Sequence, residues 1–207
     1  MKRILLFILI IPVTVSMLFS QEVAPPAKPN PPAFTGMGGN DFSAVIDRSK
    51  TVTFRNPVIP GFWSDPSVCR VGEDYYLVTS TFEYFPGVPV FHSRDLVNWE
   101  MIGYCIERPT QLPKGLNIFA TTIRYNDGTF YMITTNVGTG GNFYVTASNP
   151  AGPWSDPIFI EAQGIDPDLF FDDDGKAYVI SSTFVLFEID IATGKSLSED
   201  RKVWSGT

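Results

Sequence analysis

The sequence is poor in the residues that carry most metal, redox and nucleic-acid chemistry. Its 207 residues include one histidine, two cysteines, and 15 lysines and arginines against 22 acidic residues, so the formal net charge is −7. A surface short of cations is unsuited to nucleic acid or to an anionic membrane, and neutral partners fit it better. The single histidine, His92, has no further ligands near it in sequence, and we expect neither a metal nor a cofactor.

Two further candidate sites have plainer explanations. Cys69 and Cys105 lie in the apolar surroundings SVCRV and GYCIE. A disulfide is allowed in an exported chain, but free cysteine is among the most buried residue types, so we expect two buried free thiols. The acidic run at 172–174 lacks the spacing of a calcium loop, and we expect a solvated hairpin turn there.

The N-terminal part of the chain differs in composition from the rest. A basic start, the apolar run ILLFILIIPVTVSMLF and the small residue Ser20 are the layout of a secretory signal peptide over 1–20, although an uncleaved membrane anchor is an alternative. Residues 21–50 are rich in proline and glycine without periodicity, which predicts a linker before a folded part at 51–207. A cleaved signal predicts a secreted or periplasmic protein without stable membrane association.

Glycine, proline and phenylalanine are abundant, with 17 of each, which is typical of many turns and short apolar strands. Three stretches align, DPSVCRVGEDYYLVTS from Asp65, ATTIRYNDGTFYMITT from Ala120 and DPDLFFDDDGKAYVISS from Asp166. Each has a start residue, an apolar strand, a turn rich in Asp and Gly, and a second strand centred on a tyrosine. Because the starts lie 55 and 46 residues apart, the pattern indicates β-propeller blades, with a β-sandwich as the alternative.

The repeat gives Asp65 and Asp166 the same position in the first and third units. Equivalent positions of propeller blades are related by rotation about a central channel, so both carboxylates are expected at one end of that channel. They form a candidate acid–base pair. An aspartate before a proline is also a common turn former, which is the plainer explanation. Ala120 in the middle unit argues against it, because the fold itself needs no carboxylate there.

Several stretches in register carry a family resemblance. NPVIPGFWSDPSVCRVGEDYYLVTSTFEYFPGVPVFHSRDLVNWE, TIRYNDGTFYMITT, GGNFYVTASNPAGPWSDP and GIDPDLFFDDDGKAYVISS resemble glycoside hydrolase family 43, above all its β-xylosidase and α-L-arabinofuranosidase branch. The resemblance covers 55–207. It implies an all-β, five-bladed β-propeller, present here as roughly the first three blade units. It also implies hydrolysis of xylan or arabinoxylan, neutral polysaccharides, with inversion.

The resemblance also implies roles for individual residues. Asp65 matches the general base of the family, and Asp166 matches a second carboxylate that raises the pKa of the general acid and orients it. Phe82 and Phe119 match positions that line the sugar pocket, and Trp63 is a third candidate for sugar contact. An inverting glycosidase needs one carboxylate to deprotonate the attacking water and an acid on the other side of the bond.

The sequence departs from the family pattern at three places. The pair at 63–64 is Trp-Ser where the family usually has Tyr-Pro or His-Pro, and 120–122 is Ala-Thr-Thr where Ala-Pro-Thr is common. The general acid of the family is a glutamate in a Glu-Gly-Pro-His-like motif that follows a stretch resembling KVWSGT, and no glutamate here sits in such a motif. We therefore expect the acid beyond residue 207.

Two other functions stay open at this point. One is a catalytically incomplete fragment, or a propeller that binds sugar without hydrolysing it. The other is a related five-bladed enzyme that retains configuration and acts on fructosides, although its Asn-Asp-Pro-Asn-Gly motif is poorly matched by SDPS.

Overall fold

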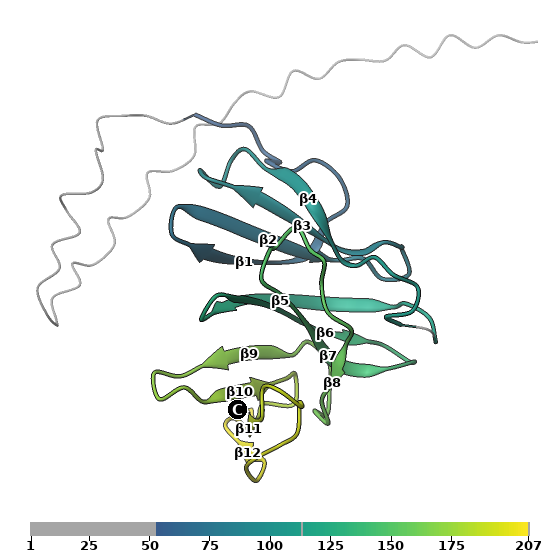
Figure 1. The fold of residues 1–207 in the computed structure, drawn as a ribbon, viewed down its shortest axis with the longest axis vertical. Coiled ribbons are helices and arrows are strands. Elements are labelled where there is room, and N and C mark those ends of the chain that lie inside the picture. The colour runs from purple at the N-terminus through teal and green to yellow at the C-terminus, as the bar shows by residue number, and fades with distance from the viewer. Residues whose placement is uncertain (1–52, 113, 207) are drawn as a thin grey trace, which may run out of the picture. The chain divides into compact units, whose positions relative to one another are not determined.

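The computed structural model describes residues 53–112 and 114–206, which contain strands and turns and no helix. Twelve strands form three antiparallel sheets of four strands each, in chain order (Figure 1). This confirms the prediction of an all-β chain built from about three propeller blades. The signal peptide predicted at 1–20 and the linker predicted at 21–50 lie outside the described residues. Within the described part, no helix is long and apolar enough to cross a membrane.

Each strand pairs with the next one along the chain, which is the meander of a propeller blade. The first sheet contains β1 (Ser64–Val71), β2 (Asp74–Ser80), β3 (Gly87–Ser93) and β4 (Glu100–Ile106). The second contains β5 (Ile118–Asn126), β6 (Thr129–Asn136), β7 (Gly141–Ala147) and β8 (Ile158–Phe159). The third contains β9 (Asp168–Phe171), β10 (Ala177–Ile180), β11 (Val185–Ile189) and β12 (Arg201–Lys202).

The predicted hairpin turns join the first two strands of each sheet. Gly72, Asp127, Gly128 and Gly175 have φ angles of 62°, 44°, 80° and 84°, in the left-handed region that glycine and aspartate tolerate. The acidic run at 172–174 forms the exposed turn between β9 and β10, as predicted. Local turn chemistry therefore sets where each hairpin reverses.

The second sheet is packed on both faces. Met132 and Ile133, neighbours on β6, are fully buried but belong to different apolar clusters. Met132 packs with Val78 and Val90 of the first sheet, whereas Ile133 packs with Leu169 of the third. Because successive side chains of a strand point to opposite faces, one strand can supply both clusters.

Polar contacts also hold the first strands of the three sheets together. Ser67 Oγ of β1 accepts a hydrogen bond from the Ile123 amide of β5 at 3.2 Å. Arg124 of β5 donates from Nη2 to both carboxylate oxygens of Asp168, at 2.7 and 2.9 Å, and from Nε to the Leu169 carbonyl of β9. These hydrogen bonds to a carboxylate and a neighbouring carbonyl fix the guanidinium group, and β1, β5 and β9 therefore lie side by side.

Both cysteines are free, as predicted. Cys105 is fully buried, but Cys69 is only half-buried, which corrects the expectation that both are inside. Burial raises the pKa of the Cys69 thiol to about 11, and it raises that of Cys105 well above its usual value. Neither thiol is poised for chemistry at neutral pH.

Candidate active site

Asp65 lies in a β-bulge at the start of β1. The register of the β1–β2 ladder shifts between Ser64 and Ser67, so Asp65 and Pro66 fall between paired residues. A bulge re-aims the side chains it carries. The Asp65 side chain is exposed, and its Oδ2 accepts a hydrogen bond of 2.7 Å from the hydroxyl of Ser80, which is almost fully buried.

The other two sheets repeat this arrangement. The β5–β6 ladder has a corresponding register shift, and it encloses Ala120. In the third sheet, Asp166 follows Ile165, whose carbonyl accepts a hydrogen bond of 2.9 Å from the Ser182 amide just beyond β10. Asp166 and Asp65 therefore occupy matching places on their sheets, as the repeat predicts.

The backbone at these aspartates is left-handed, with φ of 53° at Asp65 and 57° at Asp166. Aspartate tolerates this region better than most residues, so conformation alone gives one reason for its presence. Ala120 has no positive φ. Conformation does not explain the buried Ser80 hydroxyl that donates to the Asp65 carboxylate, because a turn former needs no such partner.

The pKa of Asp166 responds to its surroundings. Partial burial and, second, the negative charge of Asp65 raise the pKa of Asp166 above its usual value, although the Asp166 side chain is exposed overall. Asp65 lies at the start of β1 and Asp166 just before β9, so both carboxylates stand at the starts of the first strands of their sheets. Like-charge neighbours of this kind are typical of acid–base sites.

Three phenylalanine rings gather at the end of the first two sheets where β1 and β5 begin. The Phe82 ring centroid lies 5.9 Å from that of Phe62 and 5.2 Å from that of Phe119, the latter in an edge-to-face arrangement. Phe82 exchanges two backbone hydrogen bonds of 2.9 Å with Ile118 at the start of β5. Its φ of 50° is unusual for a bulky residue, and such strain is concentrated at functional sites. The structure thus brings the predicted sugar-contacting residues Phe82 and Phe119 together.

Trp63 neighbours this cluster, because it lines one hollow together with Phe62. Its ring packs edge-on against Phe91 with centroids 5.0 Å apart, and its indole N–H donates to the Pro60 carbonyl at 3.1 Å. The hollow that Trp63 shares with Phe62 has a volume of about 370 Å³, and Ser80 and Tyr84 also line it. Its predicted contact with sugar stays a prediction, and the hollow is where such a contact can occur.

Sequence reasoning missed several residues of this region. Ser80 was not singled out, because its role depends on the ladder register that places it opposite the bulge. Phe62 and Tyr84 are 69% and 73% exposed, so large apolar surface faces solvent next to the carboxylates. The run FEYFPG after β2 carries the only available sequence signal, a cluster of aromatic residues in a loop.

No metal site is evident near the carboxylates. Across residues 53–112 and 114–206, no three histidine, cysteine or acidic side chains come together as metal ligands. His92 Nε2 is instead 2.7 Å from Asp74 Oδ1, and Arg94 Nε donates to the same oxygen. These contacts lower the pKa of Asp74, the hydrogen bond with His92 being the larger cause.

Consecutive four-stranded meanders joined through their first strands define a β-propeller protein, and the paired aspartates at the starts of those strands define a candidate hydrolytic site. The chain belongs to glycosyl hydrolases family 43, whose model matches residues 54–207. The resemblance drawn from the sequence is therefore confirmed.

Curated relatives are named as an arabinofuranosidase and as xylosidase/arabinosidases. The chain is 53% identical over 167 residues to the non-reducing end α-L-arabinofuranosidase BoGH43B of Bacteroides ovatus, covering 74% of this chain and 31% of that protein. It is 47% identical over 175 residues to a xylosidase/arabinosidase of Butyrivibrio fibrisolvens, covering 75% and 34%. The chain thus spans about a third of the length of the curated relatives it matches.

Solved structures share the fold. The structure of Bacteroides ovatus Xyloglucan PUL GH43B superposes with a TM-score of 0.69 at 51% identity, over 74% of this chain and 33% of that one. The xylan β-1,4-xylosidase of Bacillus halodurans superposes with a TM-score of 0.66 at 40% identity, over 75% and 34%. The described residues correspond to part of each of these proteins.

Proposed function

We propose that these residues belong to an enzyme that hydrolyses xylosidic or arabinofuranosidic bonds of hemicellulose with inversion at the anomeric carbon. The observation that carries the proposal is the pair of aspartates at matching places of the first and third sheets, with Asp65 held by Ser80 and the pKa of Asp166 raised. The names of the relatives support the substrate class, since they are arabinofuranosidases and xylosidases.

In this proposal Asp65 is the general base. Its Oδ2 is held by the Ser80 hydroxyl, and its Oδ1 takes a proton from a water molecule. That water attacks the anomeric carbon on the face opposite the leaving oxygen, the glycosidic C–O bond breaks, and the sugar product has the inverted configuration.

Asp166 acts on the general acid rather than on the water. A negative charge close to a carboxylic acid disfavours its ionisation, so the acid stays protonated until it donates to the leaving oxygen. We propose that this acid is a glutamate in a Glu-Gly-Pro-His-like motif beyond residue 207. Asp166 is thus a positioning and electrostatic residue in the mechanism.

The aromatic rings bind the substrate. Sugars present apolar C–H faces that rest on aromatic side chains while their hydroxyl groups find polar partners. Phe82 and Phe119 supply such faces beside the carboxylates, and Phe62 and Trp63 extend them. The partner is a neutral oligosaccharide or polysaccharide such as xylan or arabinoxylan, with no role for nucleic acid.

Export is a further part of the proposal. An enzyme meets polysaccharides such as xylan outside the cytoplasm, and the N-terminal sequence has the layout of a signal peptide. We expect cleavage after Ser20 and a secreted or periplasmic product. N-terminal sequencing of the protein recovered from periplasm and medium tests this, and a product that retains Met1 in the membrane fraction would contradict it.

Turnover is tested with the complete gene product. We expect release of nitrophenol from para-nitrophenyl β-D-xylopyranoside or α-L-arabinofuranoside, with little release from the matching glucoside and galactoside. Binding of xylo-oligosaccharides without any hydrolysis would favour the alternative of a sugar-binding propeller. Equal turnover of all four glycosides would contradict the proposed substrate class.

A further inference from the structure

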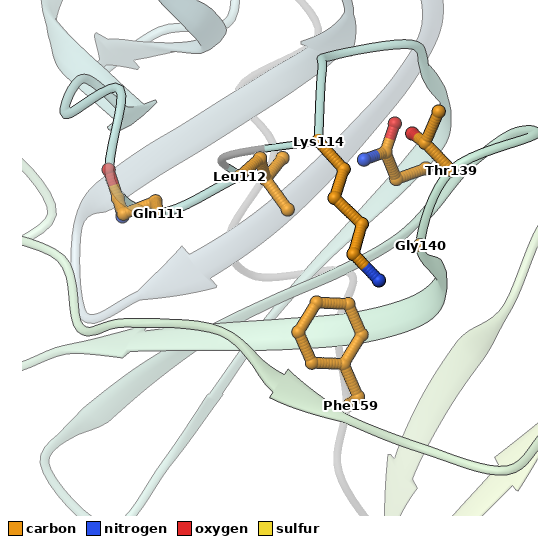
Figure 2. Close-up of a pocket in the computed structure, with 7 residues that line it drawn as sticks. Gln111, Leu112, Lys114, Thr139, Gly140 and Phe159 are labelled. Atoms are coloured by element: carbon orange, nitrogen blue, oxygen red, sulfur yellow. The ribbon is translucent and has the colours of Figure 1, made fainter.

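A separate hollow lies at the same end of the sheets as Asp65. It is formed by the loop between β4 and β5, the turn between β6 and β7, and Phe159 of β8 (Figure 2), and its volume is about 320 Å³. The last residue of β6, Asn136, pairs with Ile118 at the start of β5, and Ile118 also pairs with Phe82 of the candidate site. The hollow is therefore reached from the catalytic end of the sheets, farther out along the second sheet.

The walls of this hollow are fixed by hydrogen bonds. Asn136 accepts from the Asn117 amide at 2.8 Å through Oδ1 and donates to the Gly115 carbonyl at 2.9 Å through Nδ2. Gln111 is buried and makes four hydrogen bonds to backbone groups. Both side-chain amides are used by the protein itself, so the hollow is preformed and these groups are not its ligand-binding elements.

An aromatic ring forms the apolar part of the hollow. The Phe159 ring centroid lies 5.7 Å from that of buried Phe143, which anchors it, yet the residue is 50% exposed. Gly140 allows the turn to approach this ring, because a Cβ there would lie 3.3 Å from Phe159 Cε1 and 3.2 Å from Asn136 Nδ2. An anchored ring with one open face is a platform for the C–H face of a sugar ring.

Lys114 gives this hollow a positive charge. Its side chain extends toward Phe159 in the hollow that both residues line (Figure 2). Lys114 forms no ion pair with any described residue, and no acidic side chain lines the hollow. In a chain of net charge −7, this hollow thus presents an unneutralised cation beside an aromatic platform. The Thr139 hydroxyl is a further polar group on its rim.

We propose that this hollow binds a uronic-acid residue of the polysaccharide, with the sugar ring on Phe159 and the carboxylate on Lys114. A carboxylate neutralises the ammonium group with a charge-assisted hydrogen bond, which a neutral sugar cannot do. The site therefore recognises an acidic branch of a chain whose neutral backbone is cut at Asp65. This inference rests on the proposed function, because it takes the ligand to be a branch of the polysaccharide that is cut at Asp65.

Binding to a matched pair of probes tests the inference. The complete gene product with Asp65→Asn, which prevents hydrolysis, is titrated calorimetrically with xylotriose carrying one glucuronic acid branch and with linear xylotetraose. We expect Lys114→Gln to weaken binding of the branched acid about tenfold, the loss expected for a hydrogen bond to a charged group, and to leave xylotetraose unchanged. Lys114→Arg should restore binding, and Lys195→Gln, at an exposed position in the turn between β11 and β12, serves as the control.

Three results would overturn the inference. The first is an equal affinity of the protein with Lys114 intact for both probes. The second is an unchanged affinity of Lys114→Gln for the branched acid. The third is an equal loss of affinity for both probes in Lys114→Gln. Failure of the proposed function is seen separately, as absent turnover of aryl glycosides by the protein with Asp65 intact. Binding of the acid that depends on Lys114 would support the inference even then.

Discussion

The first and second sheets share one backbone feature and differ in its chemistry. Both have a register shift near the start of their first strand, and the shift encloses Asp65 in one sheet and Ala120 in the other. Ser80 and Thr135 pair with the residues just before these two shifts, and their hydroxyl groups donate to different partners. Ser80 donates its hydroxyl to the Asp65 carboxylate, whereas Thr135 donates to the Asn142 side chain within its own sheet.

This difference separates what the fold requires from what the site requires. The second sheet forms the bulge, packs on both faces and keeps its partner residue buried without any carboxylate. The carboxylates of the first and third sheets are therefore additions to a frame that stands without them. Variants at matching positions should then affect activity in the first sheet and stability in the second.

The largest effect is expected for Asp65→Asn. Asparagine keeps the shape and also tolerates left-handed backbone, so the fold should persist while the general base is lost. We expect kcat to fall by about 10²- to 10⁴-fold, the usual contribution of such a base. Steady-state kinetics with a thermal melt measures both properties, and Asp173→Asn in the exposed turn is the matched control. Near-normal turnover in Asp65→Asn would remove Asp65 from the mechanism.

A smaller effect is expected for Ser80 and Thr135, which pair with the residues just before the register shifts of the first and second sheets. Ser80→Ala frees the Asp65 carboxylate, and we expect kcat to fall about tenfold with KM little changed, because one neutral donor to a charged group is lost. Ser80→Thr should restore the rate. Thr135→Val should instead cost about 1 kcal/mol of stability and leave kcat unchanged. Equal kinetic effects at the two positions would contradict the division of roles.

Backbone conformation gives a third contrast. Alanine at position 120 does not have a positive φ, but alanine at position 65 would be held near φ of 53°. We expect Asp65→Ala to be less stable than Asp65→Asn by about 1 kcal/mol, because asparagine offsets part of the left-handed penalty by hydrogen-bonding locally through its side chain and alanine cannot. Urea unfolding of the two variants measures the difference. Equal midpoints with equal slopes would show that the bulge relaxes around alanine.

The smallest expected effect is on the titration of Asp166. Its pKa is raised partly by the charge of Asp65, so Asp65→Asn should lower it toward the usual value while partial burial still holds it above. Because the pKa of Asp166 is raised in the folded state, this group stabilises the fold at pH values below the ordinary pKa of aspartate. The stabilisation is lost as pH rises through the raised pKa. Carboxyl-carbon NMR of Asp166 in both proteins measures the change. An unchanged pKa would mean that the two carboxylates are not coupled.

Much of the fold was predictable because its signals are local. Hairpin turns, alternating strands and the spacing of the three starts are all visible in the sequence, and the repeat alone paired Asp65 with Asp166. Trp63 was predicted to contact sugar because it is aromatic and close to Asp65 in the sequence. The orientation of its ring toward Phe91 depends on packing that no local pattern encodes. The half-buried state of Cys69 likewise follows from the sheet, since both cysteines stand in similar apolar sequence.

The rest depends on which strands lie side by side. Ser80 reaches Asp65 across a ladder with an irregular register, which the sequence does not display. Lys114 and Phe159 stand 45 residues apart in the sequence, and only the order of the second sheet and its loops brings them to one hollow. Neither residue stands in a recognisable motif.

The stereochemistry of the released sugar tests the central claim most directly. The complete gene product is mixed with a para-nitrophenyl glycoside that it turns over, and proton NMR follows the anomeric signals before mutarotation equalises them. If Asp65 is a general base acting on water, the first sugar to appear has the inverted configuration. A first product with retained configuration would make the carboxylate a nucleophile and contradict the account.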